Sequence, residues 1–239
     1  MYLQQARAGK QWKIATIRGH DVKVSLFFLG LVALFVFMGL NSASVFFHQL
    51  MWAPVLFLSI LLHELGHAAA TKKCGFGTSE IILHGLGGVA INRRGHTSPK
   101  QGMFISLAGP AVTLLLAVVF LPLLIAYQVA VGPEATGAIT VLGHFLSLMV
   151  LVNFFLLIFN LLPIFPLDGG QTLMHFLRRK KGQSEAMLLA TKISLGTLVV
   201  SGFLTLMLFP GGGFFILLIF GLLGFANWQT LQQLTGRRR

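Results

Sequence analysis

Long apolar runs recur along the chain and are separated by short polar segments. Six of them approach the roughly 20 residues that a helix needs to cross a bilayer. They lie at about residues 24–46, 50–71, 103–127, 138–162, 186–209 and 213–230. The helix breakers "PGGG" at 210–213 separate the last two runs. The pattern predicts an all-α polytopic membrane protein with six transmembrane helices.

The segment between the second and third runs has a different pattern. Its centre, "EIILHGLGGVAI" at residues 80–91, predicts two short strands around "HGLGG". Non-helical backbone is tolerated at membrane depth only where protein buries it or where it lines a watery cavity. We therefore expect a short membrane-associated β-hairpin that packs against the helices.

Composition and charge placement agree with a membrane protein. Hydrophobic residues make up 55% of the 239 residues and charged residues 10%, against about a quarter in soluble domains. The net charge of +12 comes from Lys and Arg clusters beside the apolar runs, on alternate loops only. Such placement indicates membrane orientation and argues against nucleic-acid binding. With six spans, both termini are predicted to be cytoplasmic, at the plasma (inner) membrane if the source is prokaryotic.

One of the six acidic residues, Glu64, lies inside the second apolar run, in "HELGH". A charged group in hydrocarbon costs at least about 2.5–3.5 kcal/mol on insertion scales, so Glu64 must face protein, water or a metal. His63 and His67 are four residues apart, so both imidazoles project from the same helix face and can reach one ion. The H-E-x-x-H pattern predicts two zinc ligands and a glutamate general base. The alternative is a buried histidine pair bridged by Glu64.

A catalytic zinc site normally has three protein ligands and one open position. Asp168, in "NLLPIFPLDGG" after the fourth run, is the other acid close to apolar chain. Pro163 and Pro166 interrupt the helix before it, and the two glycines after it permit a sharp turn. Asp168 is therefore the candidate third ligand. The alternative is an ordinary helix end and turn.

These motifs together resemble the site-2 protease family of intramembrane zinc metalloproteases. "HELGH" precedes "GLGGVAI", "SLAGPAVTLLLA" and "NLLPIFPLDGG" in the order of that family, over about residues 50–175. The resemblance implies one Zn²⁺ per chain on His63, His67 and Asp168, with Glu64 as the catalytic base. It also implies one membrane protease domain over residues 1–239 with its core at 50–175. No PDZ or CBS domain is apparent in the sequence.

The implied activity is hydrolysis of a peptide bond within or near the transmembrane segment of a membrane-protein substrate, as in regulated intramembrane proteolysis. The substrate and the bilayer are the expected partners, with room for a regulatory partner. Asn160, Gly87 and Gly88 are candidates for contacting substrate or oxyanion, and His84 is the remaining histidine that could approach the site. For Asn160, capping of the broken helix is an equal alternative. An ion- or metal-coupled transporter that uses Glu64 and Asp168 is the alternative function.

Overall fold

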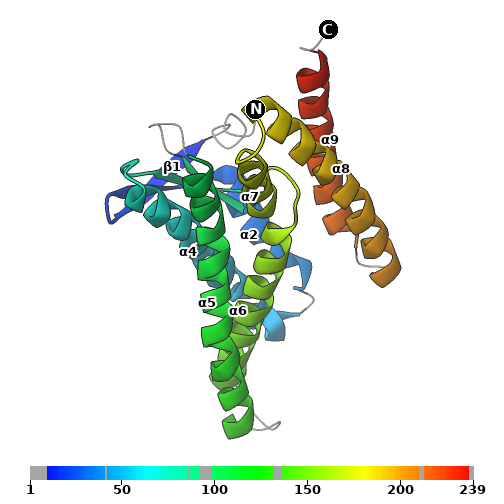
Figure 1. The fold of residues 1–239 in the computed structure, drawn as a ribbon. Helices are drawn as coiled ribbons and strands as arrows, with labels where there is room; N and C mark the ends of the chain where they lie inside the picture. Colours follow the sequence, from blue (N-terminus) through cyan, green and yellow to red (C-terminus); the bar gives the residue numbers. More distant parts are fainter. Residues whose placement is uncertain are drawn as a thin grey trace. The chain divides into compact units, whose positions relative to one another are not determined.

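The structure is a computed structural model that describes residues 10–40, 42–85, 87–91, 98–131, 136–209 and 213–236. The chain divides into two compact units, residues 1–95 with 108–157 and residues 96–107 with 158–239. Helices α5 and α6 each contribute to both units. Figure 1 traces the chain through its helices and strands.

The first unit joins a small sheet to long helices. Its elements in chain order are β1 (Gln11–Ile17), β2 (His20–Ser25), α2 (Leu26–Met38), the 3-10 turn η1 (Ala43–Val45), α3 (Phe46–Leu50), α4 (Trp52–Lys73), β3 (Glu80–His84), β4 (Gly87–Ile91), most of α5 (Pro99–Val131) and most of α6 (Ala138–Leu161). The second unit contains the first turns of α5, the last turn of α6, α7 (Asp168–Leu177), α8 (Gln183–Leu208) and α9 (Phe214–Gly236).

The described strands form one mixed sheet in the order β1-β2-β3-β4. Strands β3 and β4 pair antiparallel, at the place where the sequence predicts two short strands. Strand β3 also pairs with β2, in parallel, from Asp21–Glu80 to Val24–Leu83. The sheet is therefore twice as wide as the predicted two-stranded hairpin. Val22, Val24, Ile81 and Leu83 point from it into a core shared with α2 and α4.

The predicted first span at 24–46 is wrong as a single helix. Strand β2 continues to Ser25. Ser25 is the N-cap of α2, because its side chain accepts a hydrogen bond from the backbone N–H of Phe28. Helix α2 has 13 residues, which corresponds to about 20 Å, whereas the hydrocarbon core is about 30 Å thick. The predicted run begins at Val24, so it includes the last two residues of β2, and composition alone did not separate this strand end from the helix that follows.

Four helical stretches of the described residues are long and apolar enough to cross a membrane. They are Phe46–Lys73, Pro99–Val131, Ile139–Leu161 and Gln183–Leu208, and they correspond to the second to fifth predicted spans. Their outer surfaces are apolar: Val129 of α5 and Val199 of α8 are 82% and 73% exposed. Such surfaces suit lipid, because soluble proteins rarely expose large apolar patches. The chain is therefore an integral membrane protein.

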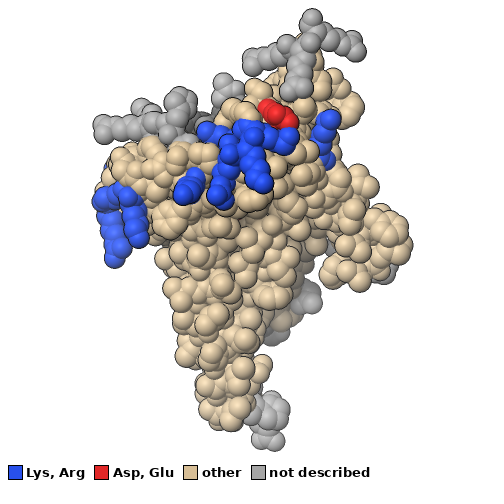
Figure 2. All heavy atoms as spheres, viewed as in Figure 1, with Lys and Arg blue, Asp and Glu red and all other residues tan. Residues whose placement is uncertain are grey.

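Charged side chains on α5 are confined to one of its ends. Figure 2 shows lysines and arginines gathered near one end of α5, whose remaining length carries no charged side chain. In the second unit, α8 and α9 lie side by side, as Figure 1 shows, and α7 packs on α8. Ile164, Leu198, Phe220 and Leu223 form the core of this unit.

Candidate metal centre

Helix α4 carries the paired histidines and the glutamate of "HELGH". His63 and Glu64 are buried, at 5% and 4% exposure, and His67 is half-buried one turn further along. The four-residue spacing places both imidazoles on one face, as the sequence predicts. Their rings cross nearly edge to face, with centroids 4.8 Å apart.

The two Nε2 atoms converge. They lie 3.2 Å apart. Two nitrogens that bind the same tetrahedral zinc at about 2.0–2.1 Å would be about 3.3 Å apart. The pair of imidazoles therefore fits a single zinc ion without rearrangement.

Thr113 of α5 determines which nitrogen of His63 is available. Its hydroxyl lies 2.8 Å from His63 Nδ1 and donates to the carbonyl of Gly109 at 3.1 Å. With that proton on the Gly109 carbonyl, the hydroxyl oxygen is an acceptor for His63 Nδ1–H in the tautomer that carries it. The Nε2 lone pair is then left for a metal, as in sites where a second residue orients a ligating histidine. No sequence pattern pointed to Thr113, which is 50 residues away from His63.

Two glycines allow α4 and α5 to approach at this point. A Cβ atom on Gly66 would lie 2.7 Å from the carbonyl oxygen of Ala108. A Cβ atom on Gly109 would lie 2.3 Å from His67 Nε2 and 2.7 Å from His63 Nε2. The glycine of "AGP" therefore keeps open the space directly in front of both imidazoles. The motif could have suggested Gly109, but its contact could not be read from the sequence.

Strand β4 lies against the glutamate. A Cβ atom on Gly88 would lie 2.8 Å from Glu64 Oε1, so this strand approaches the carboxylate as closely as a glycine allows. Gly87 has a φ of +124°, a conformation that favours glycine, and pairs with His84 across the hairpin. Of the residues expected in the site, the first unit thus brings together His63, Glu64, His67 and Gly88.

Asp168 and Asn160 belong to the second unit. Asp168 is buried, at 6% exposure, and is the first residue of α7. Asn160 is half-buried in the last turn of α6. The breaker segment between them contains a cis peptide bond at Phe165–Pro166. Gly169 and Gly170 face its backbone, since a Cβ on either would lie within 2.5 Å of backbone atoms there.

The remaining described histidines have partners elsewhere. His20 Nδ1 accepts from the backbone N–H of Ser79 at 2.9 Å, and His48 lies 3.2 Å from the hydroxyl of Thr140 and against the ring of His144. Burial lowers the pKa of His84. His175 lies beside Arg178, and burial, helped by that guanidinium, lowers its pKa to about 4. His96 lies outside the described residues.

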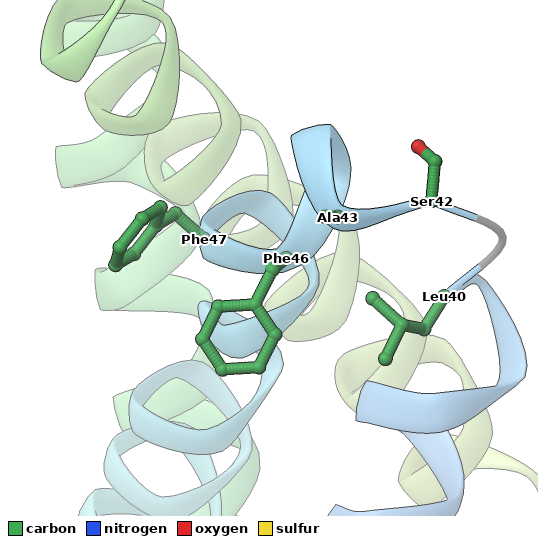
Figure 3. Close-up of a pocket in the computed structure, with 5 residues that line it drawn as sticks. All are labelled: Leu40, Ser42, Ala43, Phe46 and Phe47. Carbon is green, nitrogen blue, oxygen red and sulfur yellow. The ribbon is translucent and has the colours of Figure 1, made fainter.

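A pocket of about 450 Å³ lies near the start of α3 (Figure 3). Its lining consists of Leu40, Ser42, Ala43, Phe46 and Phe47. Because these side chains include no titratable group, the pocket offers no counterpart to the chemistry on α4.

The chain is similar to known peptidases. The model of peptidase family M50 matches residues 51–142 and 128–201. A zinc metalloprotease of Methanocaldococcus jannaschii is 32% identical over 186 residues, covering 76% of this chain and 50% of the relative. A Synechocystis protein named provisionally as a zinc metalloprotease is 30% identical over 199 residues, covering 81% of this chain and 48% of the relative. The chain thus spans about half the length of these curated relatives.

A solved structure supports the fold. The site-2 protease from Methanocaldococcus jannaschii has a TM-score of 0.62 at 24% identity, covering 93% of this chain and 95% of that one. At this identity the likeness establishes the architecture only. Together with the family match over residues 51–201, it agrees with the resemblance drawn from the motifs. The chain belongs to peptidase family M50.

Proposed function

We propose that the chain is an intramembrane zinc metalloprotease that cuts a peptide bond within or near the transmembrane segment of a membrane-protein substrate. The observation that carries the proposal is the pair of imidazoles on α4, whose Nε2 atoms lie 3.2 Å apart with buried Glu64 beside them. Family membership favours this function over the ion-coupled carrier that the sequence left open. Four apolar helices of membrane length support a lipid setting.

His63, His67 and Asp168 are the proposed ligands of one zinc ion. Support for Asp168 is its burial at the start of α7, at 6% exposure, and the usual need of a catalytic zinc for three protein ligands. Family membership supports the same ligand set.

Bound zinc would supply Lewis-acid polarisation of the scissile carbonyl and acidify a water molecule. In the proposed reaction Glu64 takes the proton from the attacking water and delivers it to the leaving amine. Thr113 keeps the ring of His63 in the required tautomer through the hydrogen bond at Nδ1. Asn160 is proposed to donate a hydrogen bond to the substrate or its oxyanion.

The substrate helix must unwind before cleavage, because its peptide bonds are covered by i→i−4 hydrogen bonds. Strand β4 is an edge of the described sheet, and its Gly88 lies against Glu64. We infer that an unwound substrate adds to this edge as a further strand, with Gly87 and Gly88 in contact with it. Substitutions that stabilise the substrate helix at the cut should then slow cleavage.

The finer membrane arrangement is part of the same proposal. It comprises a single protease domain with six membrane segments, the first of them formed by the short helix α2, both termini on the cytoplasmic side, the hairpin associated with the membrane, and residence in the plasma (inner) membrane if the source is prokaryotic. The support is the alternation of basic and uncharged loops along the sequence. Site-directed labelling of cysteines placed in those loops tests the orientation.

The central experiment uses the purified chain in detergent, with metal analysis and a transmembrane test substrate. We expect about one zinc per chain, cleavage by the natural sequence, and no cleavage by Glu64→Gln despite retained zinc. Asp168→Asn should lose zinc. A well-folded chain without metal, or a fully active Glu64→Gln variant, would refute the proposal.

A further inference from the structure

The segment that leads to Asp168 is non-helical, yet its backbone groups have partners. Ile164 N–H bonds to the carbonyl of Leu162 at 2.7 Å, and Leu167 N–H bonds to that of Ile164 at 2.8 Å. Gln171 donates its side-chain amide to the carbonyl of Pro166 at 2.9 Å. Local hydrogen bonds therefore satisfy many of the backbone groups in this segment. The backbone groups of Phe165 bond instead to side chains of more distant helices.

Ser194 of α8 holds the N–H side of Phe165. Its hydroxyl oxygen accepts from Phe165 N–H at 2.8 Å. The hydroxyl proton lies between two carbonyl oxygens, that of Ala190 at 2.8 Å and that of Pro163 at 3.3 Å. Ser194 is fully buried, so these bonds are shielded from competition by water.

Asn227 of α9 holds the other side of the same residue. Its Nδ2 donates to the carbonyl of Phe165 at 2.5 Å and to the carbonyl of Leu223, one turn back on its own helix, at 2.8 Å. Asn227 is 1% exposed and directly follows the apolar stretch 214–226 of α9. A buried amide there costs desolvation unless its partners are fixed. Side chains from two different helices thus bind the two polar groups of one residue.

The first turn of α7 packs directly against the backbone around Phe165. A Cβ on Gly170 would lie 2.4 Å from Phe165 N and from the carbonyl carbon of Ile164. A Cβ on Gly169 would lie 2.2 Å from the carbonyl oxygen of Leu161. The first turn of α7 therefore rests on the backbone that Ser194 and Asn227 hold, and Asp168 begins that turn.

We propose that Ser194 and Asn227 are positioning residues: by holding the Phe165 backbone from α8 and α9, they set the location of the Asp168 carboxylate. The proposal rests on the proposed role of Asp168 as a zinc ligand. It assigns to the α8–α9 pair a function beyond packing against each other, because the geometry of the third ligand depends on bonds made by these two helices.

A purely structural role would lower stability without a selective effect on metal binding. Ser194→Ala removes the hydrogen bond to the N–H of Phe165, and Asn227→Leu removes the hydrogen bond to its carbonyl. Thr191→Val and Thr230→Val are matched controls, since the hydroxyls of both threonines donate to carbonyls of their own helices, one turn back, and not to the backbone of Phe165. The four full-length variants are compared in detergent by zinc affinity, measured against a chelator, and by melting temperature without metal.

We expect Ser194→Ala and Asn227→Leu to weaken zinc binding by about 10–100-fold relative to the controls, the usual effect of losing a residue that orients a ligand. Melting temperatures of test and control variants should fall by similar amounts. Equal zinc affinity in test and control variants would overturn the proposal. The two test variants act on opposite sides of one residue, so either suffices if the other does not fold.

Asp168→Asn separates this inference from the function on which it rests. If that variant keeps the natural zinc affinity, the assignment of Asp168 as a ligand fails. Deuterium exchange of residues 160–171 then tests only whether Ser194 and Asn227 fix the backbone of Phe165. Faster exchange in Ser194→Ala than in Thr191→Val supports the conclusion that Ser194 of α8 fixes the backbone of Phe165. Equal exchange in these two variants overturns it.

Discussion

Substitution of Gly109 by alanine tests the candidate metal centre most directly. The added methyl carbon would lie 2.3 Å from His67 Nε2 and 2.7 Å from His63 Nε2, whereas ordinary contacts begin at 3.4 Å. The nearer imidazole must therefore retreat by about 1.1 Å. Metal sites tolerate deviations of about 0.2 Å in ligand distance, so a displacement of this size removes at least one ligand.

A shift of helix α5 offers no relief. Moving α5 away from α4 would lengthen the 2.8 Å hydrogen bond from His63 Nδ1 to Thr113, which fixes the histidine tautomer. We therefore expect Gly109→Ala to bind zinc at least about 100-fold more weakly, equivalent to about 2.7 kcal/mol. Fold stability without metal should change little, because alanine itself favours a helix by about 0.5–1 kcal/mol over glycine.

The assay is zinc content of the purified variant together with chelator competition. Gly30→Ala in α2 is the matched control, since a Cβ at this helical glycine meets no atom within 4 Å. The control should keep full zinc content. If Gly109→Ala also keeps zinc at the natural affinity, the metal does not occupy the space in front of these two imidazoles, and the proposed centre is wrong.

Three further substitutions separate the parts of the site. Gly88→Ala places a methyl carbon 2.8 Å from Glu64 Oε1, so kcat should fall at least about 100-fold with zinc retained; loss of zinc would contradict this separation. Thr113→Val removes the acceptor for His63 Nδ1–H and should weaken zinc binding about 10–100-fold; unchanged affinity would show that the hydroxyl does not orient the ring. Because burial, helped by Arg178, lowers the pKa of His175 to about 4, the unfolded chain takes up this proton first. Stability should therefore fall as pH drops from about 6.5 to 4, by at most roughly 3 kcal/mol, and His175→Asn should flatten the melting profile over that range; an unchanged profile would refute this.

The local parts of the site were predictable because they follow from helix geometry. A spacing of four residues is enough to place His63 and His67 together, and the structure has them so. Runs of apolar residues also located the four helical stretches of membrane length. In both cases one short window of sequence contains all of the information.

Features that depend on distant segments were not predictable. Thr113 contacts His63 only because Gly66 lets α5 approach α4. Neither contact can be predicted from a short stretch of sequence. The strands β1 and β2 did have a local signal, the pair Arg18 and Gly19, both with positive φ as in tight hairpin turns. It was missed because basic residues between the apolar positions made the segment look like a charged terminus.

The parallel pairing of β2 with β3 has a practical consequence for shortened versions of the protein. The family match begins at residue 51, so a version cut to that boundary would lack β2 and the Lys23–Glu80 ion pair that joins the two strands. Strand β3 would then present a bare edge of apolar sequence, the kind of edge that drives strands of separate molecules to associate. Residues 10–25 therefore need to be retained when this protein is trimmed for expression, although they precede every recognisable motif.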